Sequence, residues 1–331
     1  MYSTHLVGCF VIFVQMSMEG IVLKSTGKWY IVQLTDGAIV NCRIRGKFRL
    51  SGLSTTNPVA VGDHVTVEDQ VDEEGNRTIT AIAHRVNYIV RKSTNLSKQM
   101  QILAANVDRA YLMVTLRNPV TQLAFIDRFL VAAESFRIPT TLLFNKVDVY
   151  TEKELKKLAE LTKLYSSIGY PCHAISALSE NTISFLREEI NQKQVMISGH
   201  SGVGKSSLVN ALDPSLDLQT GEISQAHLQG QHTTTFAEMH ELASGGFIID
   251  TPGIRAFGII DLEKEHLAHY FPEMRELLGS CKFHNCLHLQ EPKCVVKQAV
   301  EEGKIAQSRY ATYIQLMTED ASDAFRRNPF E

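Results

Sequence analysis

A glycine-rich segment in the second half of the chain has the residue types and spacing of a phosphate-binding loop. It consists of Gly199, His200, Ser201, Gly202, Val203, Gly204, Lys205, Ser206 and Ser207. Backbone N–H groups of such a loop cradle anions at the start of a helix, where the helix dipole also favours phosphate. Lys205 would reach the β- and γ-phosphates of a nucleoside triphosphate, and the Ser206 hydroxyl would bind Mg²⁺. The segment therefore predicts a nucleoside triphosphate site.

A second polar motif predicts which base is bound. Asn145, Lys146 and Asp148 follow an apolar, strand-like run, and Ser176-Ala177 comes after the next such run. A carboxylate at Asp148 can accept hydrogen bonds from both the N1–H and the exocyclic amine of guanine, whereas adenine lacks this pair of donors. Asn145 would orient the loop, the Lys146 stem would lie along the base, and a backbone N–H at Ser176-Ala177 would face guanine O6. These residues favour GTP over ATP.

Two motifs downstream of the phosphate loop are expected to sense the γ-phosphate. The first ends in His232, Thr233, Thr234 and Thr235, and the second is Asp250-Thr251-Pro252-Gly253. Besides Ser206, the expected Mg²⁺ ligands come from Thr233, Thr234, Thr235 and Asp250. The Gly253 N–H would contact the γ-phosphate.

The residue that positions the attacking water is less clear from the sequence. Many GTPases use a glutamine directly after Asp-x-x-Gly, but Ile254 occupies that place and cannot orient water. We therefore expect slow intrinsic turnover and acceleration by a partner. His232 is the candidate for positioning the water, beside Lys205 and Gly253 as catalytic groups. The alternative is that His232 is a loop histidine that contacts RNA or nothing.

The order of these motifs is permuted. A Ras-like GTPase runs from the phosphate loop through the switch threonine and Asp-x-x-Gly to Asn-Lys-x-Asp, whereas here Asn145–Asp148 precedes Gly199. The same parallel sheet can form, because a permuted cut joins segments that lie close together at the surface. We expect a circularly permuted, Ras-like α/β GTPase domain at residues 91–262. Asp250 then lies near its exit, coupled to whatever follows.

A cluster of cysteine and histidine follows the GTPase motifs. Cys281, Cys286, His288 and Cys294 form a Cys₃His set, which is typical of a closed structural Zn²⁺ site. His284 is the competing histidine. The alternative is a group of unligated cysteines in a buried loop. We expect an α-helical zinc-binding domain at residues 263–331, with helical sequence over Val295–Gln315.

The N-terminal region is predicted to be a small barrel of the OB type at residues 19–90. Five short strand-like runs, at 21–23, 29–32, 38–40, 64–67 and 78–82, are separated by turn residues. Alternating cations would project from one face of a continuous strand and could follow an RNA backbone. They are Arg43, Arg45, Lys47 and Arg49. The alternative is a solvated strand face.

Between barrel and phosphate loop, strands and helices are expected to alternate. The polar, basic stretch at 87–100 is interpreted as a linker. Predicted strands at 110–116, 139–144 and 173–176 alternate with a helix at 121–136, a helix opened by a capping box at Thr151 and Glu154, and a helix capped by Asn181. This alternation is typical of a parallel sheet.

Composition limits the remaining possibilities. The chain has 331 residues, six cysteines and a formal net charge of −3, so any nucleic-acid contact must come from local patches. The grouping of the cysteines favours a metal site and a reducing cytoplasm. The apolar run at 6–14 is too short to span a bilayer, and no membrane association is expected. Residues 1–18 are interpreted as a non-functional extension: either translation starts at Met18, or the first 17 residues are a loose extension.

Taken together, the sequence resembles the circularly permuted, ribosome-small-subunit-dependent GTPase A family over residues 19 to about 320. The motifs that carry the resemblance are 199–207, 230–235, 250–253 and 281–294. It implies a bacterial, cytoplasmic, multi-domain factor of late 30S subunit maturation, with one structural Zn²⁺ and with Mg²⁺ bound beside GTP. Such a factor binds 16S rRNA in its GTP state, hydrolyses GTP to GDP when docked, and leaves. We expect a monomer.

One departure and two rival interpretations accompany the resemblance. Gln231 stands where the family usually has arginine, which removes a positive charge from the first switch. One rival is a binding switch whose hydrolysis is incidental. The other is an RNA-binding GTP/GDP switch that acts on a non-ribosomal RNA.

Overall fold

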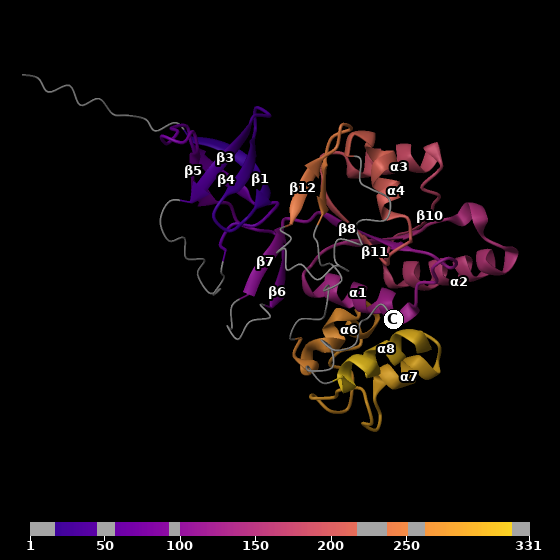
Figure 1. Ribbon diagram of the computed structural model, residues 1–331. Coiled ribbons are helices and arrows are strands. Elements are labelled where there is room, and N and C mark those ends of the chain that lie inside the picture. Colours follow the sequence, from indigo (N-terminus) through magenta and orange to yellow (C-terminus); the bar gives the residue numbers. More distant parts are fainter. Residues whose placement is uncertain (1–16, 45–56, 93–99, 217–236, 251–261, 320–331) are drawn as a thin grey trace, which may run out of the picture.

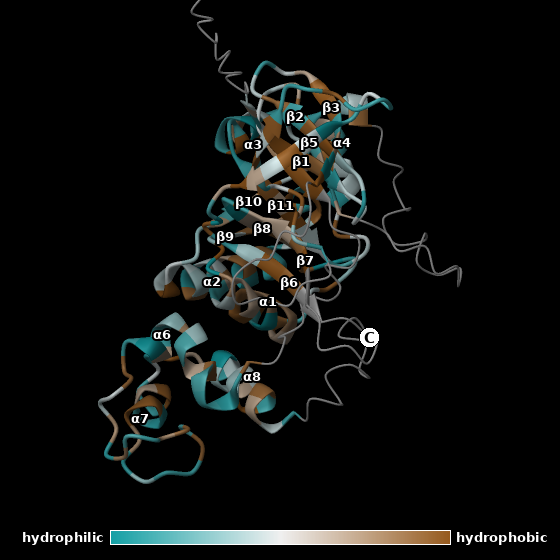
Figure 2. Ribbon diagram, turned by 90° about the vertical axis from the view of Figure 1, so that its left-hand side faces the viewer, coloured by the Kyte–Doolittle hydropathy of each residue, from teal (hydrophilic) through white to brown (hydrophobic). Residues whose placement is uncertain are grey.

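The computed structural model describes residues 17–44, 57–92, 100–216, 237–250 and 262–319. Figure 1 shows a β-barrel, a central sheet flanked by helices, and a helical domain in yellow that lies below the sheet. Hydrophobic colour is concentrated on the strands of the barrel and of the central sheet in Figure 2. Among the described helices, none is both long and apolar enough to cross a membrane.

The barrel is built from β1 (Ser17–Ser25), β2 (Tyr30–Leu34), β3 (Ile39–Ile44), β4 (His64–Glu68) and β5 (Arg77–Ile82). Its strands follow the order β1-β2-β3-β5-β4, and β4 pairs back with β1 to close the barrel. Alternating side chains such as Val22, Val32, Val65 and Val67 fill the interior. The predicted barrel is confirmed, and β1 begins slightly before Glu19.

The predicted linker at 87–100 is wrong, because strands occupy both of its ends. β6 (Tyr88–Lys92) pairs antiparallel with β7 (Met100–Ala105). Ile89 and Ile102 are both 4% exposed and help to anchor the hairpin. Its basic and polar residues at 91–98 obscured the short apolar runs that form the strands. The hairpin also spans the predicted domain boundary at residue 90.

The central sheet carries the nucleotide motifs. Its strand order is β10 (Cys172–Ala174), β9 (Thr140–Phe144), β8 (Arg109–Val114), β11 (Gln194–Gly199), β13 (Phe247–Asp250) and β12 (Glu238–Glu241). Strands β8 to β11 and β13 are mutually parallel, whereas β12 is antiparallel to β13. β12 also pairs with β1 of the barrel, where Lys24 Nζ lies 3.1 Å from Glu238 Oε2. The α/β architecture is confirmed.

Helices cover this sheet on both faces and connect its parallel strands. They are α1 (Leu123–Ser135), the 3₁₀ turn η1 (Val147–Val149), α2 (Glu152–Ile168), α3 (Glu180–Ile190), α4 (Lys205–Leu212) and the 3₁₀ turn η2 (Pro214–Leu216). The capping box of α2 is confirmed, because Thr151 and Glu154 exchange both expected hydrogen bonds. The cap predicted at Asn181 is wrong: the N-cap is Ser179, two residues earlier, and Asn181 lies in the first turn of α3.

The C-terminal domain consists of η4 (Lys264–Tyr270), α6 (Pro272–Arg275), α7 (Val295–Glu301) and α8 (Gln307–Thr318). The helical sequence predicted over Val295–Gln315 folds as two helices, α7 and α8. Gly303 adopts a left-handed φ of 72°, which ends the first helix and lets the chain turn before α8. Val131 of α1 belongs to the same apolar core as Phe271 and Tyr313, so the domain packs directly on the GTPase domain.

A buried charge network joins these two domains. Arg309 of α8 is fully buried, and its guanidinium contacts Asp127 of α1 at 3.1 Å and Glu273 of α6 at 2.7 Å. Tyr165 and Thr312 donate further hydrogen bonds to the Asp127 carboxylate, both at 2.9 Å. Burial raises the pKa of Asp127, while these partners favour its charged form.

Replacing Arg309 with methionine is expected to lower the free energy of unfolding by ~3–5 kcal/mol, because Asp127 and Glu273 lose a buried cation. Arg275→Met is the matched control, since Arg275 pairs with Glu134 in the same region with about half of its side chain exposed. Its expected cost is below ~1 kcal/mol. Chemical denaturation measures both variants, and equal costs would contradict the role of the buried network.

Candidate nucleotide site and metal cluster

The phosphate loop lies between β11 and α4, as the strand–loop–helix pattern requires. Gly202 and Gly204 have φ angles of 80° and 102°, which side chains rarely adopt. A Cβ atom on Gly204 would also lie 2.5 Å from Asn145 Nδ2. Glycine at this position therefore lets the phosphate loop approach the base-recognition motif.

Asn145 connects three of the predicted motifs. Its side-chain amide donates to the Val203 carbonyl of the phosphate loop at 2.8 Å, and its Oδ1 accepts from the Ala177 N–H at 3.0 Å. Asn145 is buried, which strengthens both bonds. Segments far apart in the sequence are thus joined by one amide. The Ala177 N–H is engaged here, so its predicted contact with guanine O6 stays a prediction.

Two lysines extend over the same loop. Lys146 Nζ donates to the carbonyls of Asn118 and Gly202, at 2.5 Å and 2.7 Å. Lys205 Nζ donates to the carbonyls of Gly199 and His200, at 2.8 Å and 2.6 Å. Both ammonium groups therefore lie beside the backbone that would surround the phosphates. Lys205 thus starts from the loop whose phosphates it would reach, whereas Lys146 links that loop to the base motif.

The neighbours of the motifs include residues that the sequence pattern does not single out. The rings of His200 and Phe125 have centroids 3.8 Å apart, which packs the phosphate loop on α1. Burial and the nearby Lys205 lower the pKa of His200, so its imidazole is neutral near pH 7. Tyr150 contacts the backbone of Asn145. Helical spacing could have placed Phe125 on α1, but no local signal indicates its partner.

Some of the remaining residues that are predicted to bind the nucleotide lie within the described part of the chain, and others lie outside it. Asp148 lies exposed in η1, and Ser176 is buried near the end of β10. Ser201 and Ser207 are exposed on the loop and α4, whereas Ser206 is half-buried. Asp250 ends β13, whose Ile249 pairs with Met196 of the phosphate-loop strand. His232, Thr233, Thr234, Thr235 and Gly253 lie outside the described residues, and their roles stay predictions.

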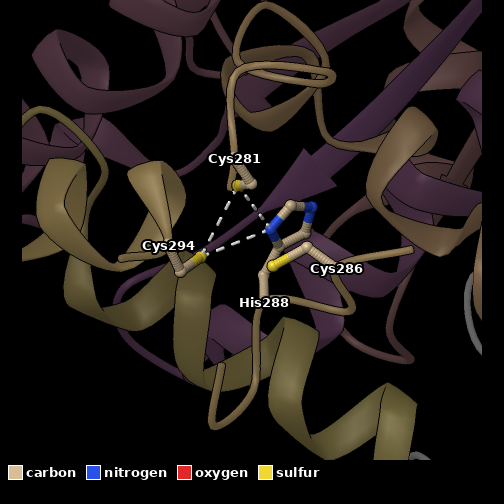
Figure 3. Close-up of side chains that lie close together, drawn as sticks. All are labelled: Cys281, Cys286, His288 and Cys294. Carbon is tan, nitrogen blue, oxygen red and sulfur yellow. Dashed lines mark hydrogen bonds between the residues drawn. The ribbon is translucent and has the colours of Figure 1, made fainter. Parts of the chain in front are cut away.

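The structure brings the four predicted metal donors together. Cys281, Cys286, His288 and Cys294 place their donor atoms within 4.8 Å of one another (Figure 3). His288 Nδ1 lies 3.4 Å from Cys294 Sγ and 3.6 Å from Cys281 Sγ. His288 is buried, whereas the competing His284 is exposed. Three sulfurs and one imidazole nitrogen in this arrangement fit a tetrahedral Zn²⁺ ion.

Second-layer contacts hold the donor loop in place. The Glu291 carboxylate accepts from the N–H groups of Leu287 and Leu289, at 2.7 Å and 2.8 Å. Tyr310 and Tyr313 of α8 donate to the carbonyls of His288 and Leu287, both at 2.7 Å. Burial raises the pKa of the Cys286 thiol to about 12, and a bound divalent cation would reverse this effect by stabilising the thiolate. The donor set and its supports therefore suit a metal ion.

The predicted cationic stripe on the barrel is only partly within the described residues. Arg43, in β3, forms ion pairs with Asp72 and Glu74, and its guanidinium lies 3.9 Å from the centroid of the Trp29 ring. These acidic partners neutralise Arg43 in the structure. Arg45, Lys47 and Arg49 lie outside the described residues, so an RNA contact by this stripe stays a prediction.

Comparison with known proteins agrees with this architecture. Residues 19–76 match the family model of the RsgA N-terminal domain, and residues 82–260 match that of the RsgA GTPase. A protein from Christiangramia forsetii, named small ribosomal subunit biogenesis GTPase RsgA, is 51% identical over 95% of this chain and 100% of its own length. A protein of the same name from Bacteroides fragilis is 50% identical over 93% of this chain and 99% of its own.

Solved structures show the same fold. The crystal structure of YjeQ from Thermotoga maritima has 36% sequence identity and a TM-score of 0.74, and covers 94% of this chain and 100% of its own. That of YloQ, described as a circularly permuted GTPase, has 30% identity and a TM-score of 0.72, and covers 96% and 99%. With its permuted motifs joined at Asn145, the chain belongs to the RsgA GTPase family and is a GTP-hydrolysing enzyme.

Proposed function

We propose that this enzyme hydrolyses GTP on the small ribosomal subunit during the late maturation of that subunit. The observation that carries the proposal is the Asn145 amide, which joins the base motif to the phosphate loop in a chain whose relatives are named for small-subunit biogenesis. GTP would bind with Mg²⁺, held by Ser206 and by the switch threonines and Asp250. The enzyme would act in the cytoplasm as a monomer.

The chain's residues divide the work of hydrolysis. The phosphate loop and Lys205 would hold the phosphates, and Asp148 would select guanine. Because Ile254 cannot orient water, the free enzyme would turn over slowly, and docking would align the two switch motifs, one with His232 and the other with Gly253. Preorganisation supplied by a partner is a common source of large rate increases in this enzyme class.

The metal cluster and the barrel would serve docking. We assign the Cys₃His cluster to one structural Zn²⁺, which would fix the shape of the C-terminal domain. The barrel would contact 16S rRNA, and the GTP state would bind more tightly than the GDP state. The alternative partner is a non-ribosomal RNA, since OB barrels bind many nucleic acids.

Sedimentation through sucrose gradients tests the partner. With a non-hydrolysable GTP analogue, we expect the chain to migrate with 30S subunits and not with 50S subunits. With GDP, most of it should remain at the top of the gradient. Equal association with both subunits, or none with 30S, would favour the non-ribosomal alternative. Lys205→Ala is the matched control, because it should lose the difference between the two nucleotides.

A further inference from the structure

Tyr150 links two loops at the edge of the nucleotide site. Its ring packs against the core beneath the central sheet, and its hydroxyl lies between two backbone groups. The Leu116 N–H donates to the Tyr150 oxygen at 2.8 Å, and the Tyr150 hydroxyl donates to the Asn145 carbonyl at 2.7 Å. One phenol therefore connects the segment after β8 to the first residue of the base motif.

Residues 115–121, which follow β8, are held together by hydrogen bonds within the segment. Thr115 and Thr121 exchange hydrogen bonds, with Thr121 N to Thr115 O at 2.8 Å and Thr115 N to Thr121 Oγ1 at 3.1 Å. The Thr115 hydroxyl also donates to the Pro119 carbonyl at 2.6 Å. These bonds close residues 115–121 on themselves. A group that bonds to this segment is thus bonded to a turn held by three hydrogen bonds of its own.

The same segment also contacts the phosphate loop. Lys146 Nζ bonds to the carbonyls of both Asn118 and Gly202, and Pro119 lies beside Gly202, where an added Cβ would meet its Cδ at 3.5 Å. Tyr150 holds the other end of the base motif on this segment. The base motif is therefore fastened on one side through Lys146 and on the other through Tyr150.

We propose that Tyr150 is a positioning residue for guanine recognition. It holds the Asn145 carbonyl, and the Asn145 side chain in turn joins the phosphate loop to Ala177. Asp148, which would meet the base, lies between Asn145 and Tyr150 in the sequence. The hydrogen bonds of these two residues therefore hold the loop on both sides of Asp148. The inference rests on the guanine site assigned above and adds a residue that lies outside its motifs.

Loss of the Tyr150 hydroxyl should weaken nucleotide binding. In Tyr150→Phe the ring keeps its packing, but the Leu116 N–H and the Asn145 carbonyl lose their partner. In the free protein the base loop would relax towards water to satisfy these groups. Binding of a nucleotide would then require the loop to return to its original conformation, and the free energy of that change would weaken the observed affinity.

The experiment is a titration of the full chain with fluorescently labelled GDP, followed by competition with unlabelled GDP and inosine diphosphate. We expect the Kd for GDP to rise about tenfold in Tyr150→Phe, which corresponds to ~1.4 kcal/mol. Inosine diphosphate lacks the exocyclic amine of guanine, so its affinity should fall less, and the preference for GDP should shrink. A merely structural role would lower the melting temperature without changing this preference.

Tyr170→Phe is the control, since its hydroxyl bonds to Glu134 at 3.2 Å, away from the nucleotide motifs. It should keep the wild-type Kd and preference. A Tyr150→Phe Kd within twofold of wild type, or an equal loss in Tyr170→Phe, would overturn the inference while leaving the guanine site intact. Failure of the wild-type chain to bind GDP would overturn the guanine site and the inference together.

Discussion

Replacing Asp148 with asparagine is expected to weaken GDP binding by about 10⁴-fold and to give the chain a preference for xanthine nucleotides. The carboxylate accepts from the N1–H and the exocyclic amine of guanine. An asparagine amide instead offers one acceptor and one donor, which match the N1–H and the C2 carbonyl of xanthine. Asp148 lies exposed beside the buried Asn145, where a base can reach it.

Competition of GDP and xanthosine diphosphate against fluorescent GDP, or against a fluorescent xanthine analogue for the variant, measures this change. Glu152→Gln is the matched control, because it removes a neighbouring exposed carboxylate at the start of α2. The control should keep its preference for guanine. A variant Asp148→Asn that still prefers GDP would show that Asp148 does not read the base.

Removal of the metal is expected to destabilise the C-terminal domain strongly. Cys286→Ser is expected to abolish binding of the proposed zinc and to unfold the C-terminal helices, because structural zinc contributes on the order of 10 kcal/mol to the folding of small modules. α8 would then lose the loop whose carbonyls Tyr310 and Tyr313 bind. Zinc content by atomic emission and thermal unfolding measure the outcome. A strong chelator should reproduce it in the wild-type chain.

Two pairs of variants sharpen this test. Cys172→Ser controls for the loss of a thiol outside the metal cluster, since Cys172 lies in β10 and its thiol donates a hydrogen bond to the Tyr170 carbonyl. His288→Ala should lose zinc and His284→Ala should keep it, because only His288 is buried among the sulfurs. One zinc per chain retained in Cys286→Ser, or lost in His284→Ala, would contradict the ligand set.

Local patterns in the sequence predicted the elements that carry the site. The phosphate loop needs glycines at fixed spacing, and the capping box at Thr151 needs only a partner three residues away, so both can be recognised without the fold. The barrel was predictable because turn residues separate its strands. The close spacing of Cys281 and Cys294 likewise indicated a metal cluster before its geometry was known.

Long-range contacts were not predictable in the same way. Asp127 and Arg309 are 182 residues apart, and neither belongs to a motif, so only the packing of α8 on α1 brings them together. Tyr150 follows the base motif by two residues, but its role depends on the Leu116 backbone. The pairing of β6 with β7 was missed because it outweighs the polar composition of the sequence at 91–98.

Activation by the small subunit is tested most directly by the rate of GTP hydrolysis by the purified chain alone, with 30S subunits and with 50S subunits. We expect slow turnover alone and with 50S, and a rise of about tenfold or more with 30S only, because Ile254 cannot orient the attacking water and a docked partner would complete the catalytic site. Equal, slow turnover in all three reactions would contradict the proposed activation by the small subunit.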